Sequence, residues 1–211
     1  MADNYLENRE EELRNYHPKK KIFRIVQSLD TLLKRNRSYR GYNHDYTVSE
    51  EKLKEIVSVV SLVPSGMNAQ RLRFRLVPTE QAHIIHPLIK LGAALPNERL
   101  PYPGTEPQGY IVVCADGGHS KIVDIDLGIA AQSMLLKAVD MGLNGIMVLN
   151  FKPEEVKAAL KLPLEPIMVI GIGKGAETIY LVHKRDDGKL AYYRKDGIHY
   201  VPKLKLEDFL I

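Results

Sequence analysis

The stretch DIDLGIAAQSMLLKAVDMG, at 124–142, indicates what lies at the centre of this protein. Its apolar residues have helical spacing, and they occur almost all round the predicted helix. A helix that is apolar on every side is stable only where other elements cover it. We therefore expect 124–142 to form a central, buried helix.

Four apolar segments predict strands. LRFRLV at 72–77 alternates apolar and polar residues, as a half-buried strand does. Three continuous apolar runs predict more deeply buried strands: YIVVCAD at 110–116, GIMVL at 145–149 and PIMVIGIG at 166–173.

Further helices are predicted around these strands. Helical spacing runs over 22–35, and the capping-box pattern Thr47-Val-Ser-Glu50 precedes an apolar face that continues to Val60. Pro153 suits the first turn of a short helix, PEEVKAALK. Another helix is expected near 79–91, with Pro87 as a potential break. The mixture of strands and helices without strict alternation predicts an α+β fold, with a mixed, largely antiparallel sheet flanked by helices.

The segments outside this core differ from it in composition and in predicted structure. Residues 1–21 are charged and poor in core-forming residues, so we expect an N-terminal arm, followed by a main domain over 22–177. The 92–109 segment predicts a long loop of the kind that often has a function. In the tail, 178–211, Asp187-Gly188 separates TIYLVHK from KLAYYRK, which predicts a hairpin belonging to the same domain.

The composition limits the functional classes. The 211 residues are 45% hydrophobic and 27% charged, which is ordinary for a globular domain. No apolar run approaches the roughly 20 residues of a membrane span, and the start lacks a secretory signal, so we expect a cytoplasmic protein that makes no membrane contact. Cys114 lies in an apolar run and is expected to be a buried thiol. The net charge of +4 suits an anionic ligand as well as a nucleic acid, and no known nucleic-acid motif accompanies it, so we expect no nucleic-acid partner.

A basic stretch, NRSYRGY at 36–42, follows the first helix. Cations at a helix C-terminus compensate the helix dipole, which would explain one or two of them. Two arginines flanking a serine, Arg37, Ser38 and Arg40, can also hold a phosphate by charge-assisted hydrogen bonds. The residues alone leave both interpretations open.

The turn PSGMNAQ, Pro64–Gln70, carries more polar side chains than a turn needs. Its amides and open main-chain groups could read the edge of a planar heterocycle. A third stretch, GIGKGAE at 171–177, lacks the helix of a dinucleotide-binding unit. It predicts either a plain turn or a turn that brings Lys174 to a phosphate. His83 and His86 have no acidic or cysteine neighbours in a metal-binding pattern, so we expect no metal site.

Taken in order, these stretches resemble the FMN-dependent nitroreductase family over about 22–175. The family has an R-R-S-x-R segment after its first long helix, whose last four residues are matched here, then P-S-x-x-N-x-Q, then D-x-G-x-A-A-Q leading into G-L-x-x. The matching stretches here are Arg37–Arg40, Pro64–Gln70, Asp126–Gln132 and Gly142–Gly145. This chain departs from the family at Arg71-Leu72, where Pro-Trp is usual, and at Asn150, where a glycine is usual. Its tail also differs, which leaves the substrate preference open.

The resemblance implies an intertwined homodimer with two FMN sites at its interface. It assigns the FMN phosphate, ribityl chain and pyrimidine side to Arg37, Ser38 and Arg40, with Lys174 as a second phosphate cation. It places the turn of the other subunit on the polar edge of the ring, through Pro64, Ser65, Gly66, Met67 and Asn68. It places the strand end along one ring face, through Met147, Val148, Leu149 and Asn150, with the main-chain N–H of Asn150 directed at flavin N5.

The resemblance also implies a reaction. Electrons would pass from NAD(P)H to a nitroaromatic, quinone or similar electron-poor acceptor by a ping-pong mechanism, with no catalytic acid or base side chain. The alternatives are an FMN protein of the same fold with other chemistry, such as flavin reduction, dehalogenation or flavin destruction, or a flavin sensor with little turnover.

Overall fold

The buried helix expected at 124–142 is α5, Lys121–Asp140, in the computed structural model, which describes residues 27–184 and 188–211. The helix begins earlier than expected because the hydroxyl of Ser120 accepts a main-chain N–H of the first turn at 3.3 Å. Nine side chains of α5 are buried, which confirms its central position.

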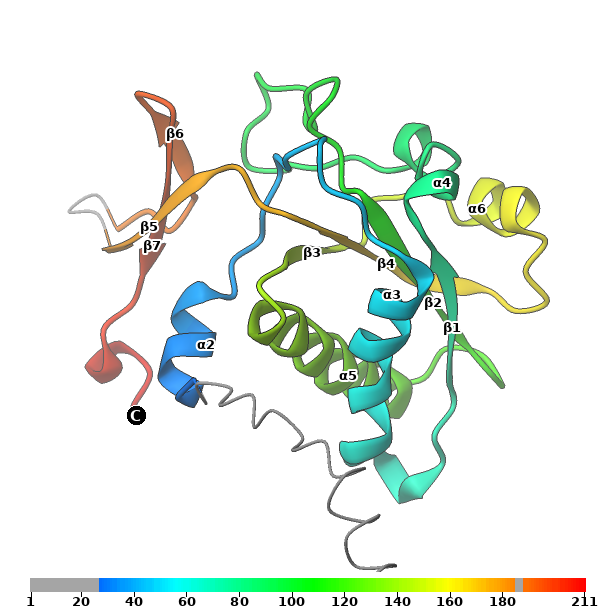
Figure 1. Cartoon of the computed structure of the whole chain (residues 1–211). Helices are drawn as coiled ribbons and strands as arrows, with labels where there is room; N and C mark the ends of the chain where they lie inside the picture. Colours follow the sequence, from blue (N-terminus) through cyan, green and yellow to red (C-terminus); the bar gives the residue numbers. More distant parts are fainter. Residues whose placement is uncertain (1–26, 185–187) are drawn as a thin grey trace, which may run out of the picture.

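Four antiparallel strands form the main sheet, in the spatial order β1-β2-β4-β3 (Figure 1). The bounds are β1 Leu72–Val77, β2 Gly109–Ala115, β3 Asn144–Val148 and β4 Pro166–Gly173, each within one residue of the prediction. Every residue of the two central strands, β2 and β4, is buried, because helices cover both faces of the sheet.

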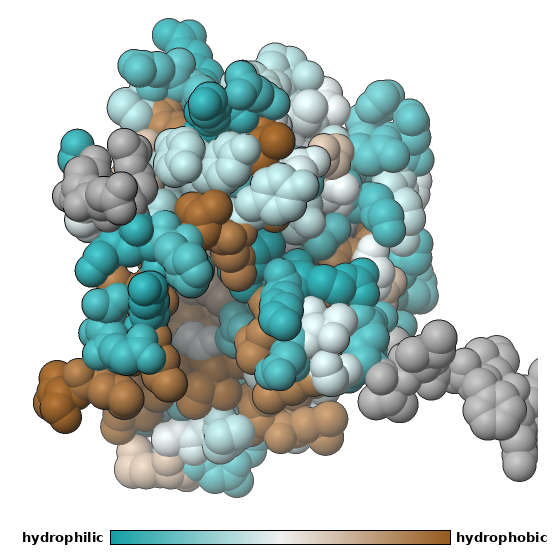
Figure 2. All heavy atoms as spheres, turned by 90° about the vertical axis from the view of Figure 1, so that its left-hand side faces the viewer, coloured by the Kyte–Doolittle hydropathy of each residue, from teal (hydrophilic) through white to brown (hydrophobic). Residues whose placement is uncertain are grey.

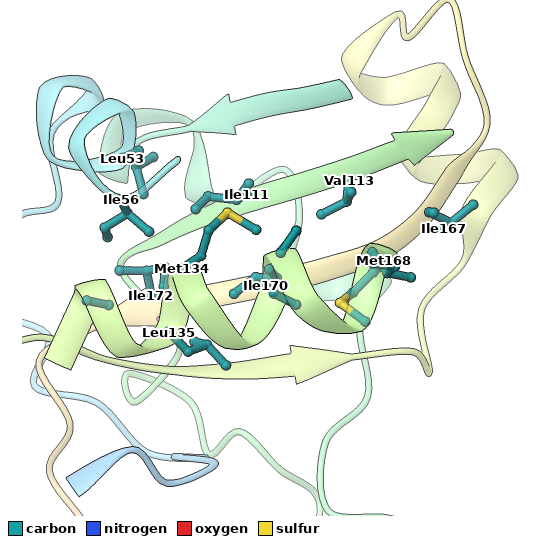
Figure 3. Close-up of a cluster of buried hydrophobic side chains, with 14 of the residues drawn as sticks. Leu53, Ile56, Ile111, Val113, Met134, Leu135, Ile167, Met168, Ile170 and Ile172 are labelled. Atoms are coloured by element: carbon teal, nitrogen blue, oxygen red, sulfur yellow. The ribbon is translucent and has the colours of Figure 1, made fainter. Parts of the chain in front are cut away.

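Each face of the sheet has its own hydrophobic core. On one face, β2 side chains such as Ile111 pack with α5 and with α3, Glu50–Val57, and Figure 3 shows Leu53 and Met134 meeting the sheet there. On the other face, the alternate β2 residues pack with α6, Pro153–Leu160, and with the segment after β1. Since successive strand residues point to opposite faces, one continuous apolar strand serves both cores.

Cys114 lies in the second of these cores. Its thiol is buried and unpaired, as predicted, and burial raises its pKa. A thiol in such surroundings favours its protonated form, which is unreactive.

Two helix starts differ from the sequence pattern. The N-cap of α3 is Ser49, whose hydroxyl accepts the N–H of Lys52, so the capping box predicted to begin at Thr47 is wrong. The reason is that the hydroxyl of Thr79 accepts the Val48 N–H at 2.8 Å and keeps the chain extended there. Helix α2 covers Leu29–Arg35, so residues 27 and 28 are not part of the helix predicted over 22–35. The reason is that Ser28 is extended and its hydroxyl caps the helix by accepting the Thr31 N–H at 3.3 Å.

Two predicted segments fall outside the described part of the chain. They are the first part of the helix expected over 22–35, up to residue 26, and the arm expected over 1–21.

The helix predicted near 79–91 is mostly absent. Only α4, Thr79–Ala82, and a 3₁₀ turn, His86–Leu88, form there. Pro87 has no main-chain N–H to donate, and Ile89 is already extended and bridged to Phe151. Pairing with the segment after β3 therefore replaces helix in this region.

The tail forms a second sheet, so the predicted hairpin is wrong. β5, Thr178–His183, pairs in parallel with β7, Ile198–Lys203, and β6, Tyr193–Lys195, pairs with the other edge of β7. The hairpin turn is Asp196-Gly197, where both residues have positive φ, as a two-residue turn of this kind requires. Asp187-Gly188 instead belongs to the connection between β5 and β6, and residues 185–187 are not described.

The α+β fold with a largely antiparallel sheet flanked by helices is thus confirmed. The three-stranded sheet lies beside α2, at one end of the main sheet (Figure 1). Within the described residues, no helix has the length and apolar character needed to cross a membrane.

Candidate functional site

A cavity of about 330 Å³ lies between the segment after α2, helix α5 and the three-stranded sheet. Its lining residues are Asn36, Arg37, Ser38, Arg40, Gln132, Leu135, Met147, Ile179, Tyr192, His199, Val201 and Lys203. Figure 2 shows the side of the molecule that carries α2 and the three-stranded sheet, where a hollow opens among hydrophilic and hydrophobic side chains.

The basic stretch after α2 reaches this cavity because it runs along the edge strand β3. Ser38 forms a bridge with Gly145, and the N–H of Tyr39 donates to the Gly145 carbonyl at 3.3 Å. The Asn36 amide donates to Gln132 of α5 at 3.3 Å. A side chain at Gly145 would come within 2.8 Å of the Gly171 carbonyl, so this close approach of backbones requires glycine.

The guanidinium of Arg40 is almost fully buried, at 7% exposure. Its Nη1 donates to the Ser38 carbonyl at 2.9 Å and lies 3.2 Å from His199 Nε2. Its Cζ lies 4.3 Å from the centre of the Tyr192 ring, a cation–π distance. Among the described residues, the charge of Arg40 is therefore held by neutral groups rather than by a carboxylate.

Residue His199 of β7 is buried, at 2% exposure. Burial, followed by the charges of Arg40 and Arg194, lowers its pKa to about 4, against an effect of Glu98 in the other direction. The imidazole is consequently neutral near pH 7.

Three cations and no carboxylate line the cavity in the described part of the chain: Arg37, Arg40 and Lys203. The Nε atoms of both arginines are buried and have no hydrogen-bond partner among the described residues. The nearby carboxylate of Glu177 already accepts the Arg40 main-chain N–H and an N–H of Arg194. Concentrated positive charge with unused donors favours an anionic ligand rich in acceptor oxygens.

The turn Pro64–Gln70 borders a different cavity, of about 380 Å³. Pro64, Ser65 and Gln70 line that cavity together with Asp126 and Ala130 of α5.

Within the turn, Met67, Asn68 and Gln70 all have positive φ, between 46° and 54°, which is uncommon for residues other than glycine. The Ser65 hydroxyl accepts the Gln70 N–H at 3.2 Å and helps to hold this shape. The side chains of Met67 and Asn68 are exposed.

A single chain therefore does not bring the turn to Arg37 and Arg40. The cavity beside the turn touches α5 at Asp126 and Ala130, and the cavity with the arginines touches it at Gln132 and Leu135, so that Asp126 and Gln132, for example, are six residues apart. Six residues correspond to about 9 Å along a helix and about 120° around it, so the two motifs face different sides of α5.

The other predicted site residues are dispersed. Met147 lines the cavity with the arginines, whereas Val148 is buried in the second core, and Leu149 and Asn150 are exposed. The Asn150 carbonyl accepts the N–H of Lys90 at 2.9 Å, and its own N–H has no hydrogen-bond partner among the described residues.

Lys174 does not line either cavity. Its ammonium donates to the Gly142 carbonyl at 2.9 Å. Its glycine neighbours permit close packing, since a side chain at Gly175 would lie 2.3 Å from the Tyr39 ring.

The sequence does not single out the contribution of the tail to the cavity. Tyr192 comes from the connection before β6, and β7 adds His199, Val201 and Lys203. The alternation in HYVPK was the available signal, because 199, 201 and 203 share one face of a strand. In the described residues, no group of three or more His, Cys, Asp or Glu side chains could hold a metal ion.

Comparison with known protein families identifies the family to which this chain belongs. Residues 33–101 and 107–174, more than half of the chain, match the sequence profile of the nitroreductase family. The chain belongs to the nitroreductase family. No curated protein matches it.

Several solved structures share the nitroreductase fold. A nitroreductase family protein from Clostridium difficile 630 has 25% identity and a TM-score of 0.57, over 72% of this chain and 86% of its own. An FMN-dependent nitroreductase from Clostridium difficile R20291 has 25% identity and a TM-score of 0.54, over 69% and 87%. A protein from Exiguobacterium sibiricum, solved in complex with FMN, has 18% identity and a TM-score of 0.58, over 72% and 90%.

The match to the nitroreductase family ends at 174, before the three-stranded sheet begins. The cavity of this nitroreductase-family protein therefore combines two parts of the chain. Arg37, Ser38, Arg40 and Met147 come from the part that matches the family, and one wall comes from the tail.

Proposed function

We propose that this protein is an FMN-dependent oxidoreductase that passes electrons from NAD(P)H to electron-poor acceptors such as nitroaromatics or quinones. The observation that carries the proposal is the cavity lined by Arg37, Arg40 and Lys203 without a carboxylate among the described residues. A phosphate monoester carries about −1.5 to −2 charges near neutral pH, so three cations match it. FMN supplies the redox chemistry when bound, and the protein supplies binding, orientation and electrostatics.

The residues present fit this cofactor. Arg37 and Ser38 would bind the phosphate and ribityl chain, and the Arg40 guanidinium would face the pyrimidine side of the ring. A fixed cation there stabilises the negative charge that develops on the ring during reduction. The apolar lining residues, Met147 and Leu135, would exclude water from the ring.

Lys203, rather than Lys174, would be the additional phosphate cation. Lys203 lines the cavity, and no ion pair with another described residue occupies its ammonium. The Lys174 ammonium is engaged by the carbonyl of Gly142. The sequence motif and the cavity thus favour different lysines, and the cavity is the more direct observation because it includes the position of each side chain.

A homodimer would complete the site. Ser65 borders the cavity on the other side of α5 from Arg37 and Arg40 in one chain, so the turn of a second copy would supply Ser65 and Asn68. The main-chain N–H of Asn150 has no partner among the described residues and would be directed at flavin N5.

The visible spectrum of purified protein tests the function. A yellow protein, or one that becomes yellow with added FMN, should bleach on anaerobic addition of NADH or NADPH and recover with a nitroaromatic or quinone. Colour that persists with both nucleotides would favour a flavin sensor. Protein that stays colourless with added FMN would contradict the proposal.

The two lysines provide a matched pair of variants. Lys203→Ala should weaken FMN binding about tenfold, as expected for the loss of one charge-assisted contact. It should leave binding of riboflavin, which lacks the phosphate, unchanged. Lys174→Ala is the control and should bind FMN as the wild type does. If Lys174→Ala weakens FMN binding and Lys203→Ala does not, Lys174 is the phosphate-binding cation instead.

A further inference from the structure

Two residues of the tail, His199 and Tyr192, contact the guanidinium of Arg40, although the tail lies beyond the residues that match the family. His199 Nε2 is 3.2 Å from Arg40 Nη1, and the Tyr192 ring centre is 4.3 Å from Cζ. Arg40 and His199 are 7% and 2% exposed. Their contact is therefore shielded from water, which would otherwise compete for the same hydrogen bonds.

The chemistry of arginine determines the state of His199. A guanidinium only donates hydrogen bonds, so His199 Nε2 must accept from Arg40 Nη1. An imidazole that accepts at Nε2 is neutral and carries its proton on Nδ1. That Nδ1 is buried without a partner among the described residues, and the lowered pKa of the ring agrees with a neutral form.

Tyr192 is itself anchored. Its phenol oxygen accepts the N–H of Ala94 at 3.1 Å, which ties it to the long loop after β1 and α4. Its ring centre lies 5.2 Å from that of His199. The carboxylate of Glu177 accepts the main-chain N–H of Arg40 and binds Arg194 of β6. The side chain of Arg40 is thus held from the tail, and its backbone is held by Glu177, which directly precedes the tail and is bound by Arg194 of the tail.

We propose that His199 and Tyr192 are positioning residues that hold the Arg40 guanidinium in the orientation that binds the flavin. An arginine fixed before its ligand arrives loses less side-chain freedom on binding, and its unpartnered Nε stays available. The identity of the ligand rests on the proposed function, whereas the contact between His199 and Arg40 does not.

The first test needs no flavin. Long-range ¹H–¹⁵N spectra of histidine-labelled protein, with the His199 signals assigned from the His199→Gln variant, report the tautomer. We expect a neutral ring protonated on Nδ1 at pH 7, and loss of this preference in Arg40→Ala. A ring protonated on Nε2, or a charged ring, would overturn the proposal.

The second test measures FMN affinity by quenching of flavin fluorescence in variants that melt near the wild type. His199→Leu should bind FMN about tenfold more weakly, because it removes the acceptor. His199→Gln keeps an acceptor near the same place and should stay within about threefold of the wild type. His183→Leu, an exposed histidine of the same sheet, is the control.

A combined variant separates positioning from general loss of structure. If His199 acts through Arg40, His199→Leu should cost no further affinity in an Arg40→Ala background. The same tenfold loss in both backgrounds, or a His199→Leu variant that binds as the wild type does, would overturn the positioning role alone. A wild-type protein that fails to bind FMN would overturn the proposed function. The tautomer of His199 would still test the contact between His199 and Arg40.

Discussion

The carboxylate of Asp126, on the buried helix α5, accepts the main-chain N–H of Gly66 at 2.8 Å. Asp126 is 6% exposed, so this bond ties the turn Pro64–Gln70 to the centre of the molecule. The opening aspartate of the D-x-G-x-A-A-Q pattern therefore has a structural task here. It fixes the turn whose amides would reach the flavin of a second copy.

Removing this carboxylate should loosen the turn. Asp126→Ala leaves the Gly66 N–H without its partner and should lower the free energy of unfolding by about 1–3 kcal/mol. Urea denaturation checks the value, and Asp126→Asn, which keeps an acceptor oxygen, should recover much of it. Asp124→Ala, on the exposed side of the same helix, is the control. Equal losses in the alanine and asparagine variants would contradict this role.

Gly66 is required for packing rather than for a positive φ. A Cβ at this position would lie 2.3 Å from Ile122 Cγ2. Gly66→Ala should therefore destabilise the protein by about 1–3 kcal/mol through overpacking. Ile122 is 42% exposed, so Ile122→Ala alone should cost little. The double variant should be more stable than Gly66→Ala. Thermal or urea unfolding of all three variants measures this. If the double variant is no more stable than Gly66→Ala, a contact other than Ile122 is responsible.

Residue His199 should make stability depend on pH. Its folded pKa is about 4 and its ordinary value is 6.5, so between these values the unfolded chain binds a proton that the folded chain does not. The contribution of the neutral ring is complete above pH 6.5 and is lost as the pH falls towards 4. The groups that surround the ring are Arg40, Arg194, Tyr192 and Glu98.

The measurement is the difference in unfolding free energy between wild type and His199→Gln across this range. The wild type should lose more stability than the variant as the pH falls, because glutamine does not titrate. His183→Gln serves as the control for a general acid effect. Parallel pH profiles for wild type and His199→Gln would show that the ring is not buried in its neutral form.

A shared site should show complementation between chains. A subunit carrying Arg37→Ala and Arg40→Ala, mixed with a subunit carrying Asn68→Ala, should restore one intact site per heterodimer. This follows because the two motifs lie on different sides of α5 in one chain. The measurement is FMN-dependent activity of verified heterodimers. Activity no higher than that of either parent would indicate a site built within one chain.

At Asn150, only the main-chain N–H should matter. Asn150→Gly should keep bound FMN and most NAD(P)H-driven reduction, since the exposed side chain has no assigned task. Asn150→Pro lacks the N–H but keeps the carbonyl that accepts from Lys90, and should show slowed flavin reduction and a shifted potential. The comparison uses protein that binds FMN and melts near wild type. A wild-type rate and potential in Asn150→Pro would rule out this donor.

The sequence by itself determined the core elements. The four strands of the main sheet and helix α5 follow from the spacing of apolar residues or from continuous apolar runs, which are local properties of the chain. The sequence also singled out Arg37, Ser38 and Arg40, because charged and hydroxyl side chains that cluster within a few residues can be recognised without knowledge of the fold. It failed at Thr47, where the hydroxyl and the main-chain N–H of Thr79 bind the backbone of Val48, and at 79–91, where Ile89 is bridged to Phe151.

Only the tertiary structure decided what surrounds those residues. His199 lies 159 positions from Arg40, and Lys203 reaches the cavity because β7 pairs with both β5 and β6. Periodicity states which face of a strand is buried but not which surface buries it, so the parallel pairing of β5 with β7 was not visible. For the same reason, the sequence left open whether Lys174 lies near a phosphate, and the contact of its ammonium with the Gly142 carbonyl depends on the packing of two loops.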